Sequence, residues 1–242
     1  MSNLESRLES DDPSQLEADR AGVLQADGSE SKHKRDTAIQ PPAESLLSAA
    51  KQTLSMIAAG ASLGDILTNL CSAIDAQSPD IISTVLLMDP DGQRLWPEAG
   101  PRVPSGWTRA LSPVAIGPHM GSCGTAAFRK ERVIISDIAT DPLWSQVPAA
   151  QSREIVLAHG LRASWSQPLL SKDGEVLGTF AMYYGAPRSP SARELRLIED
   201  AGYIAVIAIE GKRSQAALKT AFLESQTVEW GKVVRERGIK AD

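Results

Sequence analysis

A run of small residues in the middle of the chain has the composition of a loop that could hold a ligand. Gly121, Ser122, Cys123, Gly124 and Thr125 follow one another directly, and we expect a helix to open here. The free N–H groups and the dipole at a helix N-terminus suit an anion or a carbonyl oxygen. The run therefore predicts one wall of a binding pocket, although its glycines could equally serve only to make a tight turn between a strand and a helix.

The thiol of Cys123 is the group in this run that could take part in redox chemistry. A sulfenic acid formed during turnover must be resolved by a second thiol. The other cysteine, Cys71, is expected on the buried face of a helix, and the two cysteines form no CxxC pair. We interpret Cys123 as a small buried residue and predict that the chain is not an enzyme.

The three histidines, His33, His119 and His159, are isolated from one another in the sequence. Haem or a metal ion needs positioned ligands, and the spacing of these histidines provides no such set. The sequence also contains no P-loop, no Gly-x-Ser-x-Gly motif and no His-Glu-x-x-His motif. We therefore expect no metal and no cofactor.

Charge and hydropathy indicate which classes of partner the chain can bind and in which compartment it is expected. The 242 residues carry a net charge of -5, without the basic cluster that nucleic acid binding requires. The longest apolar run, residues 203–209, is far shorter than the roughly 20 residues that span a bilayer. The first residues are acidic where a signal peptide would be basic, and two cysteines fit a reducing compartment. We expect a cytoplasmic protein with no nucleic-acid or membrane partner.

Residues 1–41 differ in composition from the rest of the chain. They include nine acidic and five basic side chains, no aromatic residue and few large aliphatic ones. Such a segment cannot bury enough apolar surface to offset the entropy lost when its backbone is ordered. We predict that it is a disordered acidic leader.

Helical periodicity marks both ends of the remaining chain. Apolar residues recur at helical spacing over residues 46–57 and again over residues 66–74. A long helix is predicted over residues 191–222, where Ser191 and Glu194 can form a capping box at its start.

Two hairpins and two short strands lie between these helices. Each hairpin has an Asp-Gly turn, after residues 81–88 in the first and after residues 163–170 in the second. Shorter strands are expected at residues 114–116 and 133–135, and a short helix over residues 152–157. Strands joined by tight turns are antiparallel, and helices at both ends of the chain can cover one face of a sheet. The predicted fold class is therefore α+β with a mostly antiparallel sheet.

Several segments in a fixed order resemble bacterial GAF domains. They read GSCGTAA at 121–127, VIISDI at 133–138, GLRASWSQP at 160–168, GEVLGTFAMYY at 174–184 and IAVIAIE at 204–210. The resemblance covers residues 43–215 and leaves residues 216–242 as a helical extension. It implies a six-stranded antiparallel sheet with the N- and C-terminal helices on one face and a ligand pocket on the other. It also implies dimerisation through the first and last helices.

Trp144 and Trp165 lie in segments that flank the pocket implied by this resemblance. An aromatic wall with one polar group suits a small ligand, whereas such large rings can also simply fill a core. Whether Trp165 faces the pocket depends on strand register, because a shift of one residue reverses its direction. The predicted ligand-binding residues are Ser122, Cys123, Gly124, Thr125, Trp144 and Trp165.

The chain is similar to GAF domains that precede sensor kinases and to nitrate receptors of the GAF type. This similarity implies a homodimeric sensor that binds a small molecule, such as an anion, and passes the signal through its terminal helices. The receiving partner would be a sensor kinase or regulator of a two-component system.

Two alternatives to this function stay open. The apolar faces at 46–57 and 195–209 also suit a dimerisation module without a ligand. Free methionine sulfoxide reductases share a Gly-x-Cys-Gly loop, but residues 157–162 lack the further cysteine that they need.

Overall fold

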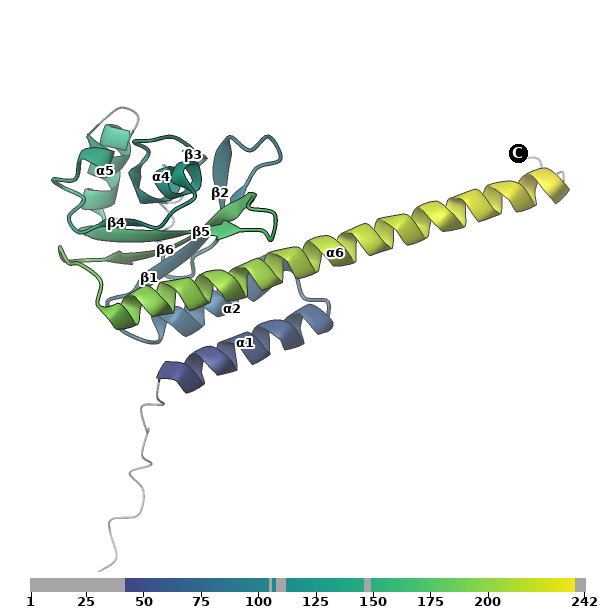
Figure 1. Ribbon diagram of the computed structural model, residues 1–242, viewed down its shortest axis with the longest axis horizontal. Coiled ribbons are helices and arrows are strands. Elements are labelled where there is room, and N and C mark those ends of the chain that lie inside the picture. Colours follow the sequence, from purple (N-terminus) through teal and green to yellow (C-terminus); the bar gives the residue numbers. More distant parts are fainter. Residues whose placement is uncertain (1–41, 105, 108–111, 146–148, 238–242) are drawn as a thin grey trace, which may run out of the picture. The chain divides into compact units, whose positions relative to one another are not determined.

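Six strands form one antiparallel sheet in the order β3-β2-β1-β6-β5-β4 (Figure 1). The computed structural model describes residues 42–104, 106–107, 112–145 and 149–237. The strands are β1 (Ile82–Met88), β2 (Arg94–Ala99), β3 (Val114–Ala115), β4 (Val133–Ile135), β5 (Ala163–Leu170) and β6 (Val176–Tyr184). The sheet confirms the predicted α+β class with six antiparallel strands.

The two predicted hairpins form the arms of this sheet. In the β1–β2 turn, Asp89 Oδ1 accepts hydrogen bonds from the N–H groups of Gln93 and Arg94. In the β5–β6 turn, Gly174 has a φ of +77°, which only glycine adopts readily. β1 pairs with β6 at the centre of the sheet, where a side chain at Gly178 would overlap the Leu86 carbonyl oxygen.

One face of the sheet is covered by the helices from the two ends of the described chain. They are α1 (Pro42–Ala58), α2 (Leu63–Asp75) and α6 (Ala192–Arg237), and Figure 1 shows them on the same side. The start of α6 has the predicted capping box. The Glu194 carboxylate accepts a hydrogen bond from the Ser191 N–H at 2.9 Å, and the Ser191 hydroxyl accepts one from the Glu194 N–H at 3.3 Å. This arrangement of the terminal helices confirms the expectation from the resemblance.

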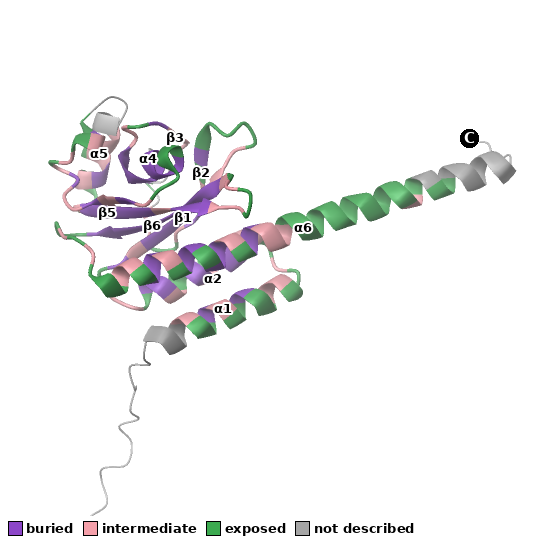
Figure 2. Ribbon diagram, in the orientation of Figure 1, coloured by how far each residue is buried: buried purple, intermediate pink, exposed green. Residues whose placement is uncertain are grey.

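The other face carries shorter helical elements. They are α4 (Gly121–Arg129), η2 (Pro142–Trp144) and α5 (Ala149–Ala158). Because strand side chains alternate between faces, the sheet supports two separate cores. Strands β5 and β6 are buried along most of their length, whereas β2 has exposed residues (Figure 2). We call the side of α1, α2 and α6 the helix face and the side of α4, η2 and α5 the α4 face.

The structure describes the C-terminal part of the chain through residue 237 but not its first 41 residues. The predicted leader, residues 1–41, lies outside the described residues. At the other end, α6 runs without interruption across the predicted boundary at residue 215, and its side chains from Arg213 to Ser225 are exposed (Figure 2). Although α6 is long, no helix in the described ranges is apolar enough over a sufficient length to cross a membrane.

Candidate functional site

The run of small residues begins α4, as the sequence predicts, and its glycines have a packing role. Gly121 has a φ of +63°, and a Cβ there would lie 2.8 Å from the ring of Trp144. A Cβ at Gly124 would overlap the carbonyl oxygen of Ala115. Thr125 Oγ1 accepts a hydrogen bond from the Met120 N–H at 3.1 Å. The glycines therefore let α4 approach β3 and Trp144 closely, which is the tight-turn role considered from the sequence.

Cys123 lies within a buried polar group that joins α4 to the sheet. Its Sγ lies 3.2 Å from Ser166 Oγ on β5 and 3.5 Å from Tyr183 Oη on β6, and 5% of the residue is exposed. Burial, with the Cys123 sulfur as a further cause, holds the pKa of the Tyr183 phenol well above its usual range. The phenol is therefore protonated at neutral pH. A thiol, a hydroxyl and a phenol meet at this point.

Two tryptophans contact residues in or next to this group. Trp144 packs against Gly121, and the ring of Trp107 meets that of Tyr183 edge-on at 4.9 Å between centroids. Both indoles are buried, and neither Nε1–H has a hydrogen-bond partner in the described ranges. An indole nitrogen can only donate. The two rings therefore offer buried donors that a ligand oxygen could accept from.

Several hydroxyl groups on the same face share this lack of a partner. Ser164 on β5 and Thr179 on β6 lie on the α4 face by strand alternation, and their hydroxyl oxygens are buried without a partner in the described chain. The Ser122 hydroxyl lies beside the Tyr183 phenol but does not complete a hydrogen bond. A buried polar group left without a partner costs about 1–3 kcal/mol. The Trp165 indole, Thr53 and Asp75 on the side of the helix face also have a buried polar atom without a partner in the described chain, so these groups are more frequent on the α4 face but not confined to it. On the α4 face they indicate a place where a ligand or water completes the bonding.

The structure does not bring Trp165 together with the other predicted residues. Ser166 contacts Cys123 on the α4 face, so its neighbour Trp165 must face the helices on the other side. There it is fully buried in the core beneath the terminal helices, 4.4 Å from the Tyr184 ring. Register decides this placement. Of the predicted residues, Ser122, Cys123, Gly124, Thr125 and Trp144 form one group, and Trp165 lies across the sheet from them.

Three further residues line the candidate site and were not among the predicted ligand-binding residues: Trp107, Ser166 and Tyr183. The alternation of Ser164 and Ser166 with apolar residues in β5 is the signal that could have indicated a polar face. Trp107 lies 16 positions before Cys123 (123 − 107). Its contact with Tyr183 is a tertiary one that no local pattern predicts.

The two cysteines lie on opposite faces of the sheet. Cys71 belongs to the core under α2 and α6, Cys123 belongs to the core under α4, and both are free and buried. Burial raises the pKa of the Cys71 thiol to about 12. Cys71 is therefore poorly placed to resolve an oxidised Cys123.

Two of the three histidines belong to the described part of the chain. His159 Nδ1 lies 2.8 Å from the carbonyl oxygen of Ile155, and Nδ1 of His119 is buried without a partner in the described chain. His33 lies outside the described residues. Within those residues, no three His, Cys, Asp or Glu side chains gather as a metal site would require.

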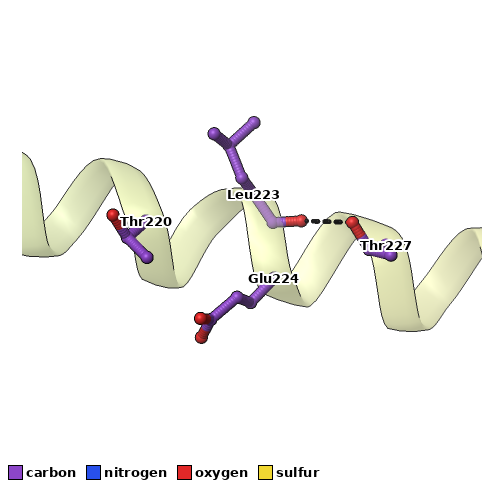
Figure 3. A pocket seen from close by; sticks show the side chains of 4 residues that line it. All are labelled: Thr220, Leu223, Glu224 and Thr227. Carbon is purple, nitrogen blue, oxygen red and sulfur yellow. Dashed lines mark hydrogen bonds between the residues drawn. The ribbon is translucent and has the colours of Figure 1, made fainter.

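A shallow hollow lies along α6. Thr220, Leu223, Glu224 and Thr227 line it, all from one helix, as Figure 3 shows. The Thr227 hydroxyl donates to the Leu223 carbonyl oxygen at 2.9 Å within the helix. A hollow with walls from one helix alone does not enclose a ligand.

Sequence comparisons agree with this fold. A family model described as GAF domain matches residues 60–210. The methyl sulfide methyltransferase-associated sensor of Methanosarcina acetivorans is 36% identical over 177 residues. That match covers 73% of the chain and 17% of the relative, so the chain corresponds to a small part of that sensor.

Solved structures share the fold at low identity. The free methionine-R-sulfoxide reductase of Neisseria meningitidis, in complex with its substrate, has a TM-score of 0.58 at 14% identity, covering 72% of the chain and 91% of that structure. Domains of phosphoenolpyruvate-protein phosphotransferases from Acinetobacter and Coxiella burnetii both have a TM-score of 0.54, at 13% and 16% identity. These matches cover 71% and 72% of the chain and 97% and 98% of the two domains. At such identities the likeness concerns the fold alone.

Proposed function

The chain belongs to the GAF domain family, and on that premise we propose that it is a sensory domain that binds a small molecule on the α4 face. The ligand lies between the start of α4 and the two buried indoles, Trp107 and Trp144. Binding shifts the packing of the terminal helices and so alters a partner. The similarity to a sensor protein supports this assignment.

The observation that carries the proposal is the set of unpartnered donors around Cys123. The indole N–H groups of Trp107 and Trp144 are buried without a partner in the described ranges, and an indole can only donate. The hydroxyls of Ser164 and Thr179 are in the same condition. A ligand with acceptor oxygens, such as a small oxyanion or a carbonyl compound, would satisfy them.

A ligand screen tests this proposal. Thermal stability and tryptophan fluorescence would be measured with nitrate, nitrite, cyclic nucleotides and small carboxylates, because a ligand that binds only the folded state raises its stability. We expect a stabilising ligand whose effect is lost in Trp144→Phe. Trp96→Phe is the matched control, since Trp96 is 48% exposed on β2. Absence of stabilisation by every compound, or equal loss in both variants, would contradict a site on the α4 face.

We propose no enzymatic activity for the domain. The fold is shared with a methionine sulfoxide reductase, but Cys71 and Cys123 lie on opposite faces of the sheet. A thiol that resolves a sulfenic acid must reach it. Turnover of free methionine sulfoxide by the wild-type protein, abolished in Cys123→Ser, would overturn this part of the proposal.

We further propose that the domain is a cytoplasmic homodimer that acts on a sensor kinase or regulator. Leu47 and Leu54 on α1, and Tyr203 and Ile207 on α6, are all at least 50% exposed. Large apolar side chains at these spacings suit packing against a second helix pair. The alternative, a dimerisation module without a ligand, rests on the same surface. Sedimentation should show a dimer that Leu54→Lys weakens, and a monomer at micromolar concentration would contradict both versions.

A further inference from the structure

We propose that β5 carries the signal across the sheet, because Ser166 contacts the candidate site while its two neighbours contact arginines that are paired with α6. This inference rests on the proposed function and concerns the regulation of the same site. In β5, Ser166 faces α4, whereas Trp165 and Gln167 are held on the helix face by two arginines, Arg188 and Arg132. A displacement of the strand on one side must therefore appear on the other.

The contact on the α4 face joins β5 directly to the candidate site. Ser166 Oγ lies 3.2 Å from Cys123 Sγ, and both residues are buried. Cys123 sits in the first turn of α4, beside the Gly121–Trp144 contact. A ligand that reorders the donors at the start of α4 would act on Ser166 through this sulfur.

The first link on the helix face is made by Arg188, and we call it the Arg188 clamp. Its guanidinium carbon lies 5.5 Å from the Trp165 ring centroid and 4.5 Å from that of Tyr184. Its Nη2 also lies 2.7 Å from a carboxylate oxygen of Glu194, in the first turn of α6. One cation therefore joins the β5 indole to the start of α6.

The second link is made by Arg132, which directly precedes β4, and we call it the Arg132 clamp. Arg132 Nε donates to Gln167 Oε1 at 2.6 Å, and its Nη2 lies 3.2 Å from Glu199 on α6. The helix is close here, because a Cβ at Gly202 would lie 3.1 Å from the side chain of Gln167. Both clamps therefore connect β5 with the first three turns of α6.

The energetics of the clamps fit a role in coupling more than one in stability. Glu199 and Arg188 are partly exposed, and ion pairs exposed to solvent contribute little to the free energy of folding. Their geometry matters more, since Arg188 has both an aromatic and a carboxylate partner. Between the clamps and the site, β5 is hydrogen-bonded on both edges, to β4 and to β6.

Hydrogen exchange on a set of variants tests this route without any ligand. Ser166→Ala perturbs the α4 side, and the double variant Arg132→Met/Arg188→Met opens both clamps while keeping the aliphatic stems. We expect Ser166→Ala to raise exchange rates in the first turns of α6 by about fivefold. In the double variant, the added effect of Ser166→Ala should fall below about twofold, because residues coupled through one network have non-additive effects and the double variant breaks that network.

Arg102→Met is the matched control, because Arg102 binds the carbonyl oxygens of Ile81 and Pro79, none of which belongs to β5 or α6. In that background the effect of Ser166→Ala on α6 should persist. Arg188→Lys keeps the charge near Glu194. Compared with Arg188→Met, it should restore part of the effect of Ser166→Ala on exchange in α6.

The route would be overturned if Ser166→Ala left the exchange rates in α6 unchanged. It would also be overturned if Ser166→Ala had the same effect in the double variant as in the wild type. Because the experiment uses no ligand, its failure leaves the ligand screen as a separate test of the proposed function.

Discussion

The two faces of the sheet are built from alternating residues of the same strands, but buried polar groups without a partner in the described chain are more frequent on the α4 face. Those on the α4 face belong to Trp107, Ser122, Trp144, Ser164 and Thr179, whereas those on the side of the helix face belong to Thr53, Asp75 and Trp165. On the helix face, Phe180, Met182 and Tyr184 of β6 pack under α6, and the Tyr184 ring is stacked by Arg188. On the α4 face, Tyr183 meets the Trp107 ring, whose indole N–H has no partner in the described chain, and the Thr179 hydroxyl is likewise without a partner there. The difference suggests that one face supplies the stability of the domain, whereas the other keeps bonding capacity available for a ligand.

The largest expected effect separates the two faces along a single strand. Phe180→Ala removes a fully buried ring from the helix face and should lower the free energy of unfolding by about 3–5 kcal/mol. Tyr183→Phe removes only the phenol oxygen from the α4 face, whose recorded contact is a 3.5 Å approach to sulfur, and should cost less than about 1 kcal/mol. Urea unfolding would measure both. Equal losses would show that the α4 face is as important for stability as the helix face.

A smaller loss is expected from filling the close contact under α4. A methyl group at Gly124 would overlap the Ala115 carbonyl oxygen, and a forced fit of this kind costs about 1–3 kcal/mol. The matched control is Gly185→Ala, because a Cβ there would meet its nearest neighbour at an ordinary 3.5 Å. A thermal midpoint unchanged in Gly124→Ala would mean that the start of α4 yields easily, and that the site is softer than its packing indicates.

Two buried threonines on the α4 face allow a finer test of the unpartnered groups. Thr84 Oγ1 donates to the Ala99 carbonyl oxygen at 2.7 Å, whereas Thr179 Oγ1 has no partner in the described ranges. Thr84→Val should therefore lower the free energy of unfolding by about 1 kcal/mol, and Thr179→Val should raise it by about 1 kcal/mol. Denaturant unfolding of both variants would measure these two changes in the free energy of unfolding. A loss of stability in Thr179→Val would show that its hydroxyl is already satisfied without a ligand.

Much of the fold could be predicted because its signals are local. The Asp-Gly turns, the capping box at Ser191 and the helical periodicity at both chain ends depend on residues a few positions apart. The full course of α6 was less predictable, since its exposed part has no buried face to show a period. Its side chains from Arg213 to Ser225 are exposed in this structure.

The candidate site was only partly predictable, for a different physical reason. The start of α4 is visible as a run of small residues, but the direction of Trp165 depends on the register of β5 with β6, which pairs it with Met182. Register is set by the whole hairpin and not by the residues around Trp165. The same holds for Trp107, because its contact with Tyr183 joins residues 76 positions apart (183 − 107).

The smallest expected effect concerns a buried carboxyl on the helix face and tests whether that face is fully satisfied. Asp75 Oδ1 accepts the Ser83 N–H at 2.7 Å, but Oδ2 has no partner in the described chain. Burial raises the pKa of Asp75, against the lowering effects of the Ser83 hydrogen bonds and the Arg102 charge. Because the unfolded chain releases this proton at lower pH than the folded one, stability falls as pH rises between the two pKa values and is then constant.

Asp75→Asn should remove this pH dependence, since an amide can keep the bond from Ser83 but carries no charge. The free energy of unfolding of the variant, relative to that of the wild type, should therefore increase as pH rises through that window. Urea titrations from acid to neutral pH would measure this difference. A difference that is constant with pH, or that decreases, would mean that Ser83 and Arg102 stabilise the carboxylate fully. The buried carboxyl of Asp75 would then not destabilise the helix face, and the two faces would differ more strongly in how well their buried polar groups are stabilised.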